Sequence, residues 1–496
     1  MLLYNQVSWI AILSFVFSIY PYYTTKEDSE SNHVKSSEKI LMSIVIFNGG
    51  ESSPHKPLIY PTFDFNFRIW PNGSNHLTGE GKKQMENLGR SFKDYYKYID
   101  FPAEILEKVD QSEKLLTKYD REPIISNKVY KRDDEKHPKI KQSANINKVD
   151  DGRYHFRTIK IDNYVESAHH FAQGFFGNVS GLSYIERPLS PSFYLDSINH
   201  TYNESYNMIS PVTVKADMDY LLSSGRACKK FNKYVYNALT QSPEAKFVNI
   251  YYKTLFEILG PKAGINNMDL LKLPLLLHSL LILNDTVSRY EQALENNSPM
   301  IDISLKGKLN LPQWINQTIL KTLFRLHDQV WRPLLYGTKE QIKLGVGQLF
   351  NRIIFLIKEK LQKAFIDSND AIHEKPEMFF FVVPDYTLYA LRLALNANDM
   401  ETRDHNESID TYITRVMNVE KIDKINYGQA LIIEFESVDH DKKDFLLKFY
   451  EKKSAHPKDL IKMYNAGECG KSCSLVQFYN QIKDILPKQI EKECRI

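Results

Sequence analysis

KILMSIVIFNGG, residues 39–50, is a nearly continuous apolar run that ends at two glycines. Such a run predicts a buried strand, and its abrupt end predicts a glycine-rich loop at the tip of that strand. In α/β folds, ligands bind where the carboxyl ends of strands meet such loops. The residues that follow Phe47 are therefore the first candidates for function.

A helix is predicted directly downstream, because apolar residues recur at helical spacing and Thr78 is suited to cap the N-terminus. Residues 153–161 predict a short strand, and residues 167–174 predict a helix after it. The apolar positions of the first helix are Met85, Leu88, Phe92, Tyr95 and Ile99.

The C-terminal part repeats the strand–loop–helix order. Residues 378–383 predict a second buried strand that ends at Pro384 and Asp385 and leads into a helix, and residues 429–438 and 444–451 predict a hairpin. Between about residues 214 and 365, apolar residues recur at helical spacing, which predicts several helices. Residues 268–283 predict a core helix within this region.

These elements predict an α/β fold: a mostly parallel sheet with helices on both faces, plus a smaller helical subdomain inserted in the middle of the chain. The expected boundaries are a signal peptide at 1–23, a first α/β part at 38–213 with a charged insertion at about 108–151, a helical subdomain at 214–365 and a second α/β part at 366–496.

Composition supports a folded chain, since 43% of the 496 residues are hydrophobic and 25% are charged. Sixty-four Lys and Arg against 61 Asp and Glu leave a net charge of +3. A balance this close to neutrality gives no global field toward nucleic acid, so no nucleic-acid partner is expected.

The segment from Val7 to Tyr20 has no ionised side chain and is followed by a charged run. It is short for a membrane span and fits a signal peptide cleaved between about Tyr20 and Thr25, with no span left after its removal. A signal anchor and an ordinary buried segment are the alternatives, because Lys and Arg are absent before it.

Cysteines and glycosylation sequons also favour export. Four cysteines predict disulfides. Half of a zinc site is the alternative for Cys469 and Cys473, but no second pair at ligand spacing accompanies them, so no metal or other cofactor is expected. Eight sequons favour a secretory route. They lie at Asn72, Asn178, Asn199, Asn203, Asn284, Asn296, Asn316 and Asn406.

The stretches VIFNGGESSP (residues 45–54) and RIWPNGSNHLTGEGKKQMENLG (68–89) together resemble the histidine acid phosphatases. That family's signature is RHGxRxP, followed by a WPxGxxxLTxxGxxQxxxLG run. Similarity continues at residues 156–176, 310–314, 382–396 and 469–479, so it covers nearly the whole chain after the leader except the charged insertion. The second motif matches at Trp70, Pro71, Gly73, Leu77, Thr78, Gly81, Gln84, Leu88 and Gly89.

The first motif differs from the family signature at the catalytic positions. In the family, the signature histidine attacks phosphorus, and arginines hold the phosphoryl oxygens. By the resemblance, the first arginine falls on Asn48, the nucleophile on Gly49 and the second arginine on Ser52. Glycine has no side chain that could act as a nucleophile.

The other family positions are partly kept. The third arginine is Arg157, and the His-Asp pair, which binds phosphate and protonates the leaving group, becomes Pro384 and Asp385. Proline cannot donate a hydrogen bond, so Asp385 is a vestigial proton donor. Arg157 has two interpretations that the sequence leaves open: a retained anion contact, or a structural ion pair with Asp385 or Glu51.

Other histidines are poor replacements for the nucleophile. His55 lies beyond Pro54 and would need the loop to fold back. The pair His327-Asp328 lies in an amphipathic helix and is interpreted as solvated, and His440-Asp441 lies in the hairpin turn and is interpreted as surface charge.

The resemblance implies disulfides between Cys469 and Cys473 and between Cys228 and Cys494. It favours a secreted or lysosomal, endomembrane-lumenal glycoprotein that is a catalytically inactive pseudophosphatase with a binding or structural role. The alternative is an active acid phosphatase that hydrolyses phosphomonoesters through a non-standard site. The ligand or protein partner is unknown, and a homodimer is compatible with the resemblance.

Overall fold

The computed structural model describes residues 39–66, 69–96, 153–177, 185–186, 211–295, 309–366, 376–396, 406–419, 424–439 and 444–496. Residues 38–496 form one compact unit. The expectations for the leader, the charged insertion and His440-Asp441 lie outside the described residues, as do those for the sequons at Asn178, Asn199, Asn203 and Asn296.

The described strands form one mixed sheet in the order β3-β4-β2-β5-β1-β6-β7-β8, with β9 paired to β7. Its strands are β1 (Lys39–Asn48), β2 (Tyr154–Ile159), β3 (Ile185–Glu186), β4 (Val212–Val214), β5 (Glu377–Val383), β6 (Ala430–Asp439), β7 (Asp444–Lys452), β8 (Lys462–Met463) and β9 (Ser472–Cys473).

The half of the sheet from β3 to β1 is parallel, and the half from β1 to β8 is antiparallel. The predicted hairpin is confirmed as β6 and β7. In the parallel half, Asn48 pairs with Val383 across β1 and β5, so both strands end at the same edge of the sheet. That register brings the glycine loop after β1 next to the Pro-Asp break after β5.

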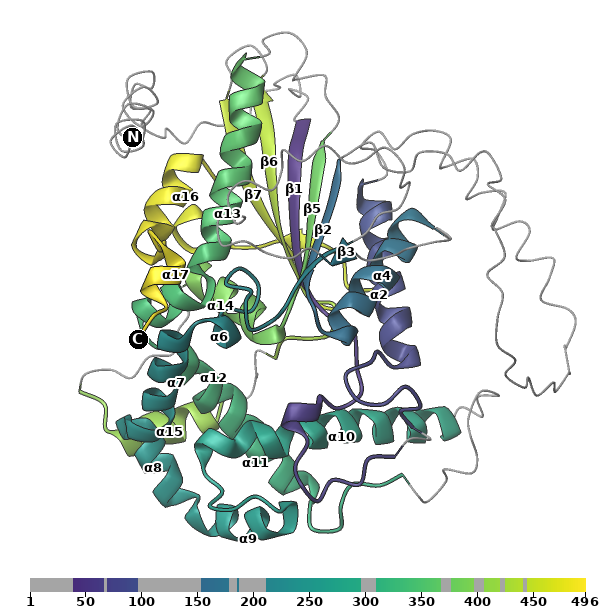
Figure 1. Cartoon of the computed structure of the whole chain (residues 1–496), viewed down its shortest axis with the longest axis vertical. Helices are drawn as coiled ribbons and strands as arrows, with labels where there is room; N and C mark the ends of the chain where they lie inside the picture. Colours follow the sequence, from purple (N-terminus) through teal and green to yellow (C-terminus); the bar gives the residue numbers. More distant parts are fainter. Residues whose placement is uncertain are drawn as a thin grey trace, which may run out of the picture. The chain divides into compact units, whose positions relative to one another are not determined.

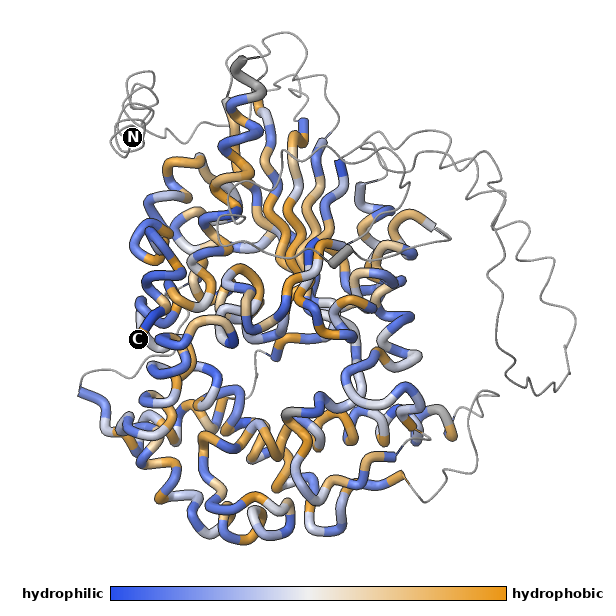
Figure 2. The backbone as a smooth tube through the Cα atoms, in the orientation of Figure 1, coloured by the Kyte–Doolittle hydropathy of each residue, from blue (hydrophilic) through white to orange (hydrophobic). Residues whose placement is uncertain are grey.

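Helices cover both faces of the sheet (Figure 1). Helices α2 (Gly79–Tyr96) and α4 (Asp162–Phe176) lie on one face, and α13 (Lys339–Ile366), α14 (Asp385–Leu395) and α16 (Leu475–Ile482) lie on the other. Side chains of β1 alternate between two cores, which is why the strand is apolar throughout. Figure 2 shows the central strands as the most hydrophobic part of the sheet.

The two helices α2 and α4 approach so closely that backbone meets backbone. A Cβ atom on Gly174 would lie 2.0 Å from the carbonyl oxygen of Glu86, and one on Gly89 would lie 2.1 Å from that of Phe171. Glycine is therefore required at both positions by packing.

The predicted buried face of α2 needs one correction. Thr78 accepts the Gly81 amide at 3.0 Å, as a cap should. Tyr95, however, is 36% exposed, and Tyr96 is fully buried in its place. The Tyr96 hydroxyl lies 2.6 Å from Ser43 Oγ and donates to Glu434 at 2.7 Å. These polar partners and the spacing of four from Phe92 place Tyr96 inside.

A helical region precedes β5 in the chain. It contains α6 (Ser224–Ala227), α7 (Lys229–Gln241), α8 (Pro243–Tyr251), α9 (Lys253–Ala263), α10 (Leu273–Glu295), α11 (Gln317–Leu326), a π-helical turn η4 (His327–Trp331) and α12 (Arg332–Leu335). After β5 come α15 (Ile409–Met417) and α17 (Ile490–Glu493).

One described helical stretch, Leu270–Gln292, is long and apolar enough to cross a membrane by length and composition alone. Half of its most hydrophobic window is buried within the protein. Leu273, Leu276, Leu277 and Leu280 belong to the main core. The predicted core helix is thus confirmed as the beginning of α10.

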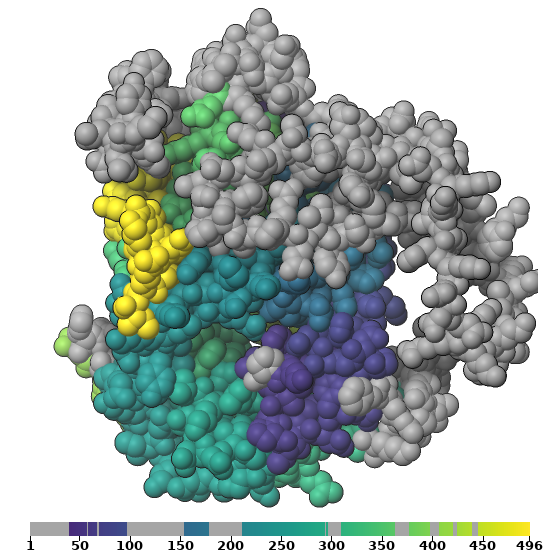
Figure 3. All heavy atoms as spheres, in the orientation of Figure 1, coloured from purple at the N-terminus to yellow at the C-terminus, as the bar shows by residue number. Residues whose placement is uncertain are grey.

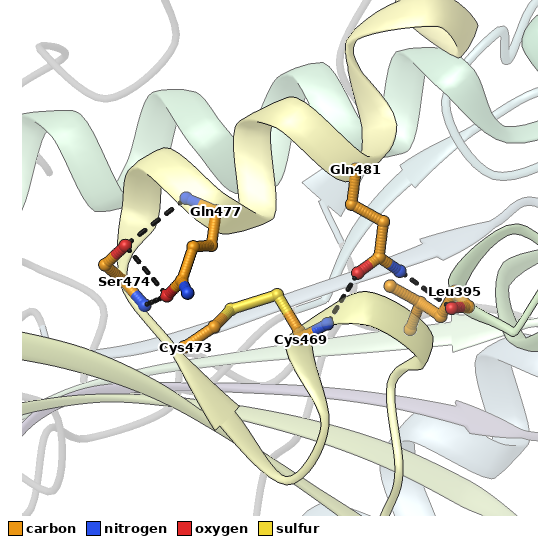
Figure 4. The surroundings of a disulfide bond; sticks show 6 residues. All are labelled: Leu395, Cys469, Cys473, Ser474, Gln477 and Gln481. Atoms are coloured by element: carbon orange, nitrogen blue, oxygen red, sulfur yellow. Dashed lines mark hydrogen bonds between the residues drawn. A yellow bond between two sulfur atoms is a disulfide. The ribbon is translucent and has the colours of Figure 1, made fainter. Parts of the chain in front are cut away.

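Both disulfides that the resemblance implies are present. Cys228 bonds to Cys494 and Cys469 bonds to Cys473. Figure 4 shows the small loop closed by the second bond, with Gln481 accepting from the Cys469 amide at 2.9 Å and donating to Leu395 at 2.7 Å. The short bond thus fixes the segment that leads into α16.

Candidate functional site

The six family positions do gather at one edge of the sheet, and we call them the strand-tip site. They are Asn48 at the end of β1, the loop residues Gly49 and Ser52 after it, Arg157 on β2, and Pro384 and Asp385 at the junction of β5 and α14. The parallel registers β1–β5 and β2–β5 bring them together, as expected for functional residues of a parallel sheet.

The nucleophile position, Gly49, has close neighbours on α4. A Cβ atom on Gly49 would lie 3.0 Å from Ser167 Oγ and 3.3 Å from the ring of Tyr164. Ser167 is held in place, because its hydroxyl donates to the Asn163 carbonyl at 2.5 Å and accepts the Gly50 amide at 3.1 Å. Tyr164 and Ser167 are not among the positions that the sequence motifs point to, although both lie within the similar stretch 156–176.

The two positions that lack their arginines are occupied by neutral side chains with neutral partners. The side-chain amide of Asn48 donates to the Asn426 carbonyl at 3.1 Å, and Asn163 donates to Ser52 Oγ at 3.5 Å. No positive charge is therefore supplied from either of these positions.

Arg157 forms a structural ion pair. One of its terminal nitrogens donates to Asp219 Oδ1 at 2.9 Å, and the Asp219 side chain is completely buried. The same oxygen accepts the amides of Leu221 and Leu222. Of the two interpretations of Arg157, the structure therefore contains an ion pair, with Asp219 as the partner in place of the expected Asp385 or Glu51.

Glu51 is instead paired across the molecule with the helical region. Arg289 of α10 donates to its carboxylate at 2.5 Å, and Thr78 donates to the same oxygen at 2.9 Å. Burial raises the pKa of Glu51, and Arg289 and Thr78 oppose that rise. This contact fastens the glycine loop to α10.

Asp385 is also engaged. Pro384 caps α14 by accepting the Thr387 amide at 3.0 Å, which leaves Asp385 as the first residue of the helix. Its Oδ2 atom accepts from Arg332 at 2.9 Å. One carboxylate oxygen of Asp385 is thus engaged by Arg332, while its side chain is 42% exposed.

Arg332 belongs to a buried charged cluster that sequence analysis missed. It lies 3.4 Å from Asp328, whose carboxylate accepts from His327 Nδ1 at 2.7 Å. Burial lowers the pKa of Arg332, but Asp328 and Asp385 outweigh burial and raise it overall. Burial raises the pKa of Asp328, but Arg332 and His327 have the larger combined effect, so the pKa of Asp328 is lowered overall.

The interpretation of His327-Asp328 as a solvated pair is therefore wrong. The side chains are 15% and 3% exposed, and the pair lies in the π-helical turn η4. A π turn contains an extra residue, so apolar spacing counted at 3.6 residues assigns the wrong face there. The available signal was Arg332 itself, a charge inside the apolar run VWRPLLY.

Two histidines lie next to this cluster. The backbone amide of His55 donates to Nε2 of His278 at 3.0 Å, and their rings meet edge to face. Burial, with nearby Arg226, lowers the pKa of His55 to about 4. Burial, with His55, lowers the pKa of His278 to about 4, and Asp385 opposes this.

These lowered pKa values predict acid sensitivity. A histidine with a folded-state pKa below its ordinary value of 6.5 destabilises the folded state as pH falls from about 6.5 toward 4. His278→Gln keeps an acceptor for the His55 amide but cannot titrate. We expect the stability difference between this variant and wild type to move by about 2 kcal/mol in favour of the variant between pH 7 and pH 4.5.

The measurement is urea unfolding of both proteins across that range. The comparison between variant and wild type is needed because buried Glu434, whose pKa is raised to about 7, works in the opposite direction. A difference that is constant with pH would contradict the assignment of His278.

No group of three or more His, Cys, Asp or Glu side chains among the described residues is placed to hold a metal ion. The two charged side chains of the strand-tip site are each paired with a residue outside it, Arg157 with Asp219 and Asp385 with Arg332. The site therefore offers no nucleophile at position 49 and no guanidinium at 48 or 52, and its one guanidinium, at 157, is engaged by Asp219.

Comparisons with known proteins were made with the whole chain. No protein-family model and no curated protein matches it. Among solved structures it is similar to the apo phytase of Hafnia alvei, at 10% identity and a TM-score of 0.46, with 94% of this chain and 100% of that chain covered.

Two further solved structures are also phytases. That of Citrobacter braakii is 11% identical, with a TM-score of 0.42, and the match covers 92% of this chain and 100% of that one. That of D. castellii is 12% identical, with a TM-score of 0.43, and the match covers 97% and 87%.

Proposed function

We propose that this chain is a secreted or lumenal histidine acid phosphatase-like glycoprotein that is catalytically inactive and has a binding or structural role. The observation that carries the proposal is Gly49. The residue supplies no nucleophile, and a Cβ atom there would already be in tight contact with Ser167 Oγ at 3.0 Å and with Tyr164 at 3.3 Å.

The loss of the phosphate clamp supports the same proposal. Phosphoryl transfer depends on positive groups around the equatorial oxygens. Asn48 and Ser52 are neutral, and Arg157 is held by Asp219. Asp385, the family's acid, is held by Arg332.

The alternative, an active phosphatase with a non-standard site, has two nearby candidates for a nucleophile. Burial raises the pKa of Tyr164 well above its ordinary value of 10, so its hydroxyl stays protonated and is a poor nucleophile. Neither ring nitrogen of His55 has a hydrogen-bond partner within the described part of the chain, so no carboxylate orients the ring. The inactive form is therefore the better supported of the two.

The helical region contains an open cavity that is a candidate place for a ligand. It has a volume of about 360 Å³ and lies between α10, α11 and the segment before β6. Such a volume is within the usual range for small-molecule sites. Side chains that line it include Leu281, Asp285, Lys321, Phe324, Arg325 and Lys424.

The test of the proposal is a phosphatase assay. We expect purified wild-type protein to hydrolyse para-nitrophenyl phosphate no faster than a buffer blank at acid or neutral pH, because no nucleophile faces the site. Measurable turnover that is lost in Asp385→Ala, in a protein shown to be folded, would refute inactivity and support the alternative.

Restoring the family residues tests how the activity was lost. Asn48→Arg, Gly49→His, Ser52→Arg and Pro384→His together should recover phosphate binding only when Tyr164→Ala makes room for the new histidine. Isothermal titration with inorganic phosphate measures this. Equal binding by the fourfold and fivefold variants would show that Tyr164 does not block the position.

Export gives a further expectation, since two disulfides fit an oxidising compartment. Mature protein should begin between about Tyr20 and Thr25. Asn72, Asn316 and Asn406 are exposed and should carry glycan. Asn316 caps α11 through its oxygen, which leaves its nitrogen free for the sugar.

Asn284 should remain unmodified, because it is half-buried within α10 and its oxygen accepts from Gln317. N-terminal sequencing and glycopeptide mass spectrometry of secreted protein measure both expectations. Recovery of an intact chain without glycan from the cytosol would contradict the secretory route.

A further inference from the structure

Helices α8 and α9 carry large apolar side chains that are exposed to solvent. Ile250 is 76% exposed, Tyr251 is 67% exposed and Ile258 is 51% exposed. Phe247 stacks on Tyr251 with ring centroids 5.6 Å apart. The opposite side of the same helices is buried in the main core through Ala245, Val248, Phe256 and Leu259. The helices are therefore held in place while their outer side stays apolar.

This exposure is concentrated. Of the eleven large hydrophobic residues that are exposed among the described residues, five lie between positions 234 and 258. Single exposed hydrophobics are normal on a soluble protein, whereas a group of them marks an interaction surface. The five are Tyr234, Tyr236, Ile250, Tyr251 and Ile258.

Together with α7, these helices form a segment with a net positive charge. Residues 229–263 contain six lysines and two glutamates, a net charge of 6 − 2 = +4, while the whole chain has +3. Two of the lysines have carboxylate partners: Lys230 lies 3.3 Å from Glu340, and Lys253 lies 3.7 Å from Glu257 at an exposed pair.

The other four lysines are exposed and have no carboxylate partner within 4.0 Å among the residues that the structure describes. Their charges are therefore available to an anionic partner. These four are Lys229, Lys233, Lys246 and Lys262.

We propose that the outer side of α7, α8 and α9, the α7–α9 surface, binds an anionic lipid surface. Aliphatic side chains that project from a surface can enter the boundary of the acyl chains, and tyrosines are suited to the headgroup level. Surrounding lysines attract anionic headgroups while their methylene stems lie along apolar surface. The α7–α9 surface provides all three, with Ile250 and Ile258 as the inserted residues.

The position of these helices fits a peripheral contact. Figures 1 and 3 show α8 and α9 at the outer edge of the helical region, on the side away from the sheet. The strand-tip site lies at the carboxyl ends of β1 and β5, at the sheet itself. Lipid binding and the proposed loss of catalysis are thus carried by different residues and can be tested separately.

The test is co-sedimentation of glycosylated full-length protein with vesicles. One set is pure phosphatidylcholine, and the other contains about one third phosphatidylserine. We expect binding to the anionic set only, with affinity that falls as salt rises. The triple variant Ile250→Ser, Tyr251→Ser, Ile258→Ser should lose at least about tenfold in affinity, since each change removes buried apolar area.

Two variants separate the contributions. Lys246→Gln should reduce affinity about fivefold, the value expected for one lysine near the surface. Leu460→Ser is the matched control, because Leu460 is 68% exposed but lies just before β8. It should bind like wild type.

Three results would overturn the proposal. The first is no binding of wild type to the anionic vesicles beyond that to the neutral ones. The second is an equal loss of affinity in Leu460→Ser and the triple variant. The third is a wild-type dimer in analytical ultracentrifugation that the triple variant converts to a monomer, since the α7–α9 surface would then be an interface between two copies of the chain.

Discussion

Removal of the Cys228–Cys494 disulfide is expected to lower the free energy of unfolding by about 5 kcal/mol. The bond closes a loop across 266 positions and ties the start of α7 to the C-terminus. In the chain-entropy model, a loop this long restricts the unfolded chain strongly. Both cysteines are buried, and the Lys230 amide donates to the Cys494 carbonyl beside the bond. Urea unfolding of Cys228→Ala, Cys494→Ala measures the loss.

The second disulfide provides the matched control. Cys469 and Cys473 are separated by only 4 positions, so the same model gives about 2 kcal/mol for Cys469→Ala, Cys473→Ala. If the short bond costs more to remove than the long one, loop entropy is not the source of the stabilisation. Local contacts around Gln481 would then be the source.

The elements that could be predicted from the sequence are those fixed by local pattern. The apolar runs of β1 and β5, the cap at Thr78 and the hairpin of β6 and β7 each depend on residues that are near in sequence. The disulfide pairing came from the resemblance, which carries long-range information that periodicity does not. Together these predictions placed the six positions of the strand-tip site at one edge of the sheet.

The partners within that site could not be predicted in the same way. Arg157 meets Asp219 across 62 positions, and Arg332 meets Asp385 across 53. The sequence separation of the two residues predicts neither contact, because each contact depends on how the helical region packs against the strand tips. The buried state of Asp328 was missed for a local reason, since the π turn breaks the helical period.

Replacement of Arg332 with methionine is the second large effect that we expect. The Arg332 side chain is 6% exposed and is shared by Asp328 and Asp385. Without it, the Asp328 carboxylate, 3% exposed, keeps His327 as its one hydrogen-bonded partner within the described part of the chain. Removing one partner of a buried ion pair costs about 3 to 5 kcal/mol, because the remaining charge is left uncompensated.

The control is Arg90→Met, whose pair with Glu86 lies at 3.8 Å on the surface and should contribute less than about 0.5 kcal/mol. The double variant Arg332→Met, Asp328→Asn should recover part of the loss, because it removes the buried charge as well. Equal stability of Arg332→Met and Arg90→Met in urea at pH 7 would contradict the role given to the cluster.

The pH dependence of the Arg332→Met effect separates charge from packing. In wild type the pKa of Asp328 lies below its ordinary value of 3.8, so its contribution is present above that pH and is lost as pH falls through the folded-state value. In the variant, burial without Arg332 raises that pKa, and Asp328 takes up a proton at higher pH. The stability gap between wild type and variant should therefore narrow as pH falls from 7 toward 4. A stability difference that stays constant with pH would mean that the variant is destabilised by lost packing against Tyr389. In wild type the Arg332 guanidinium lies over the Tyr389 ring, 5.4 Å from its centroid.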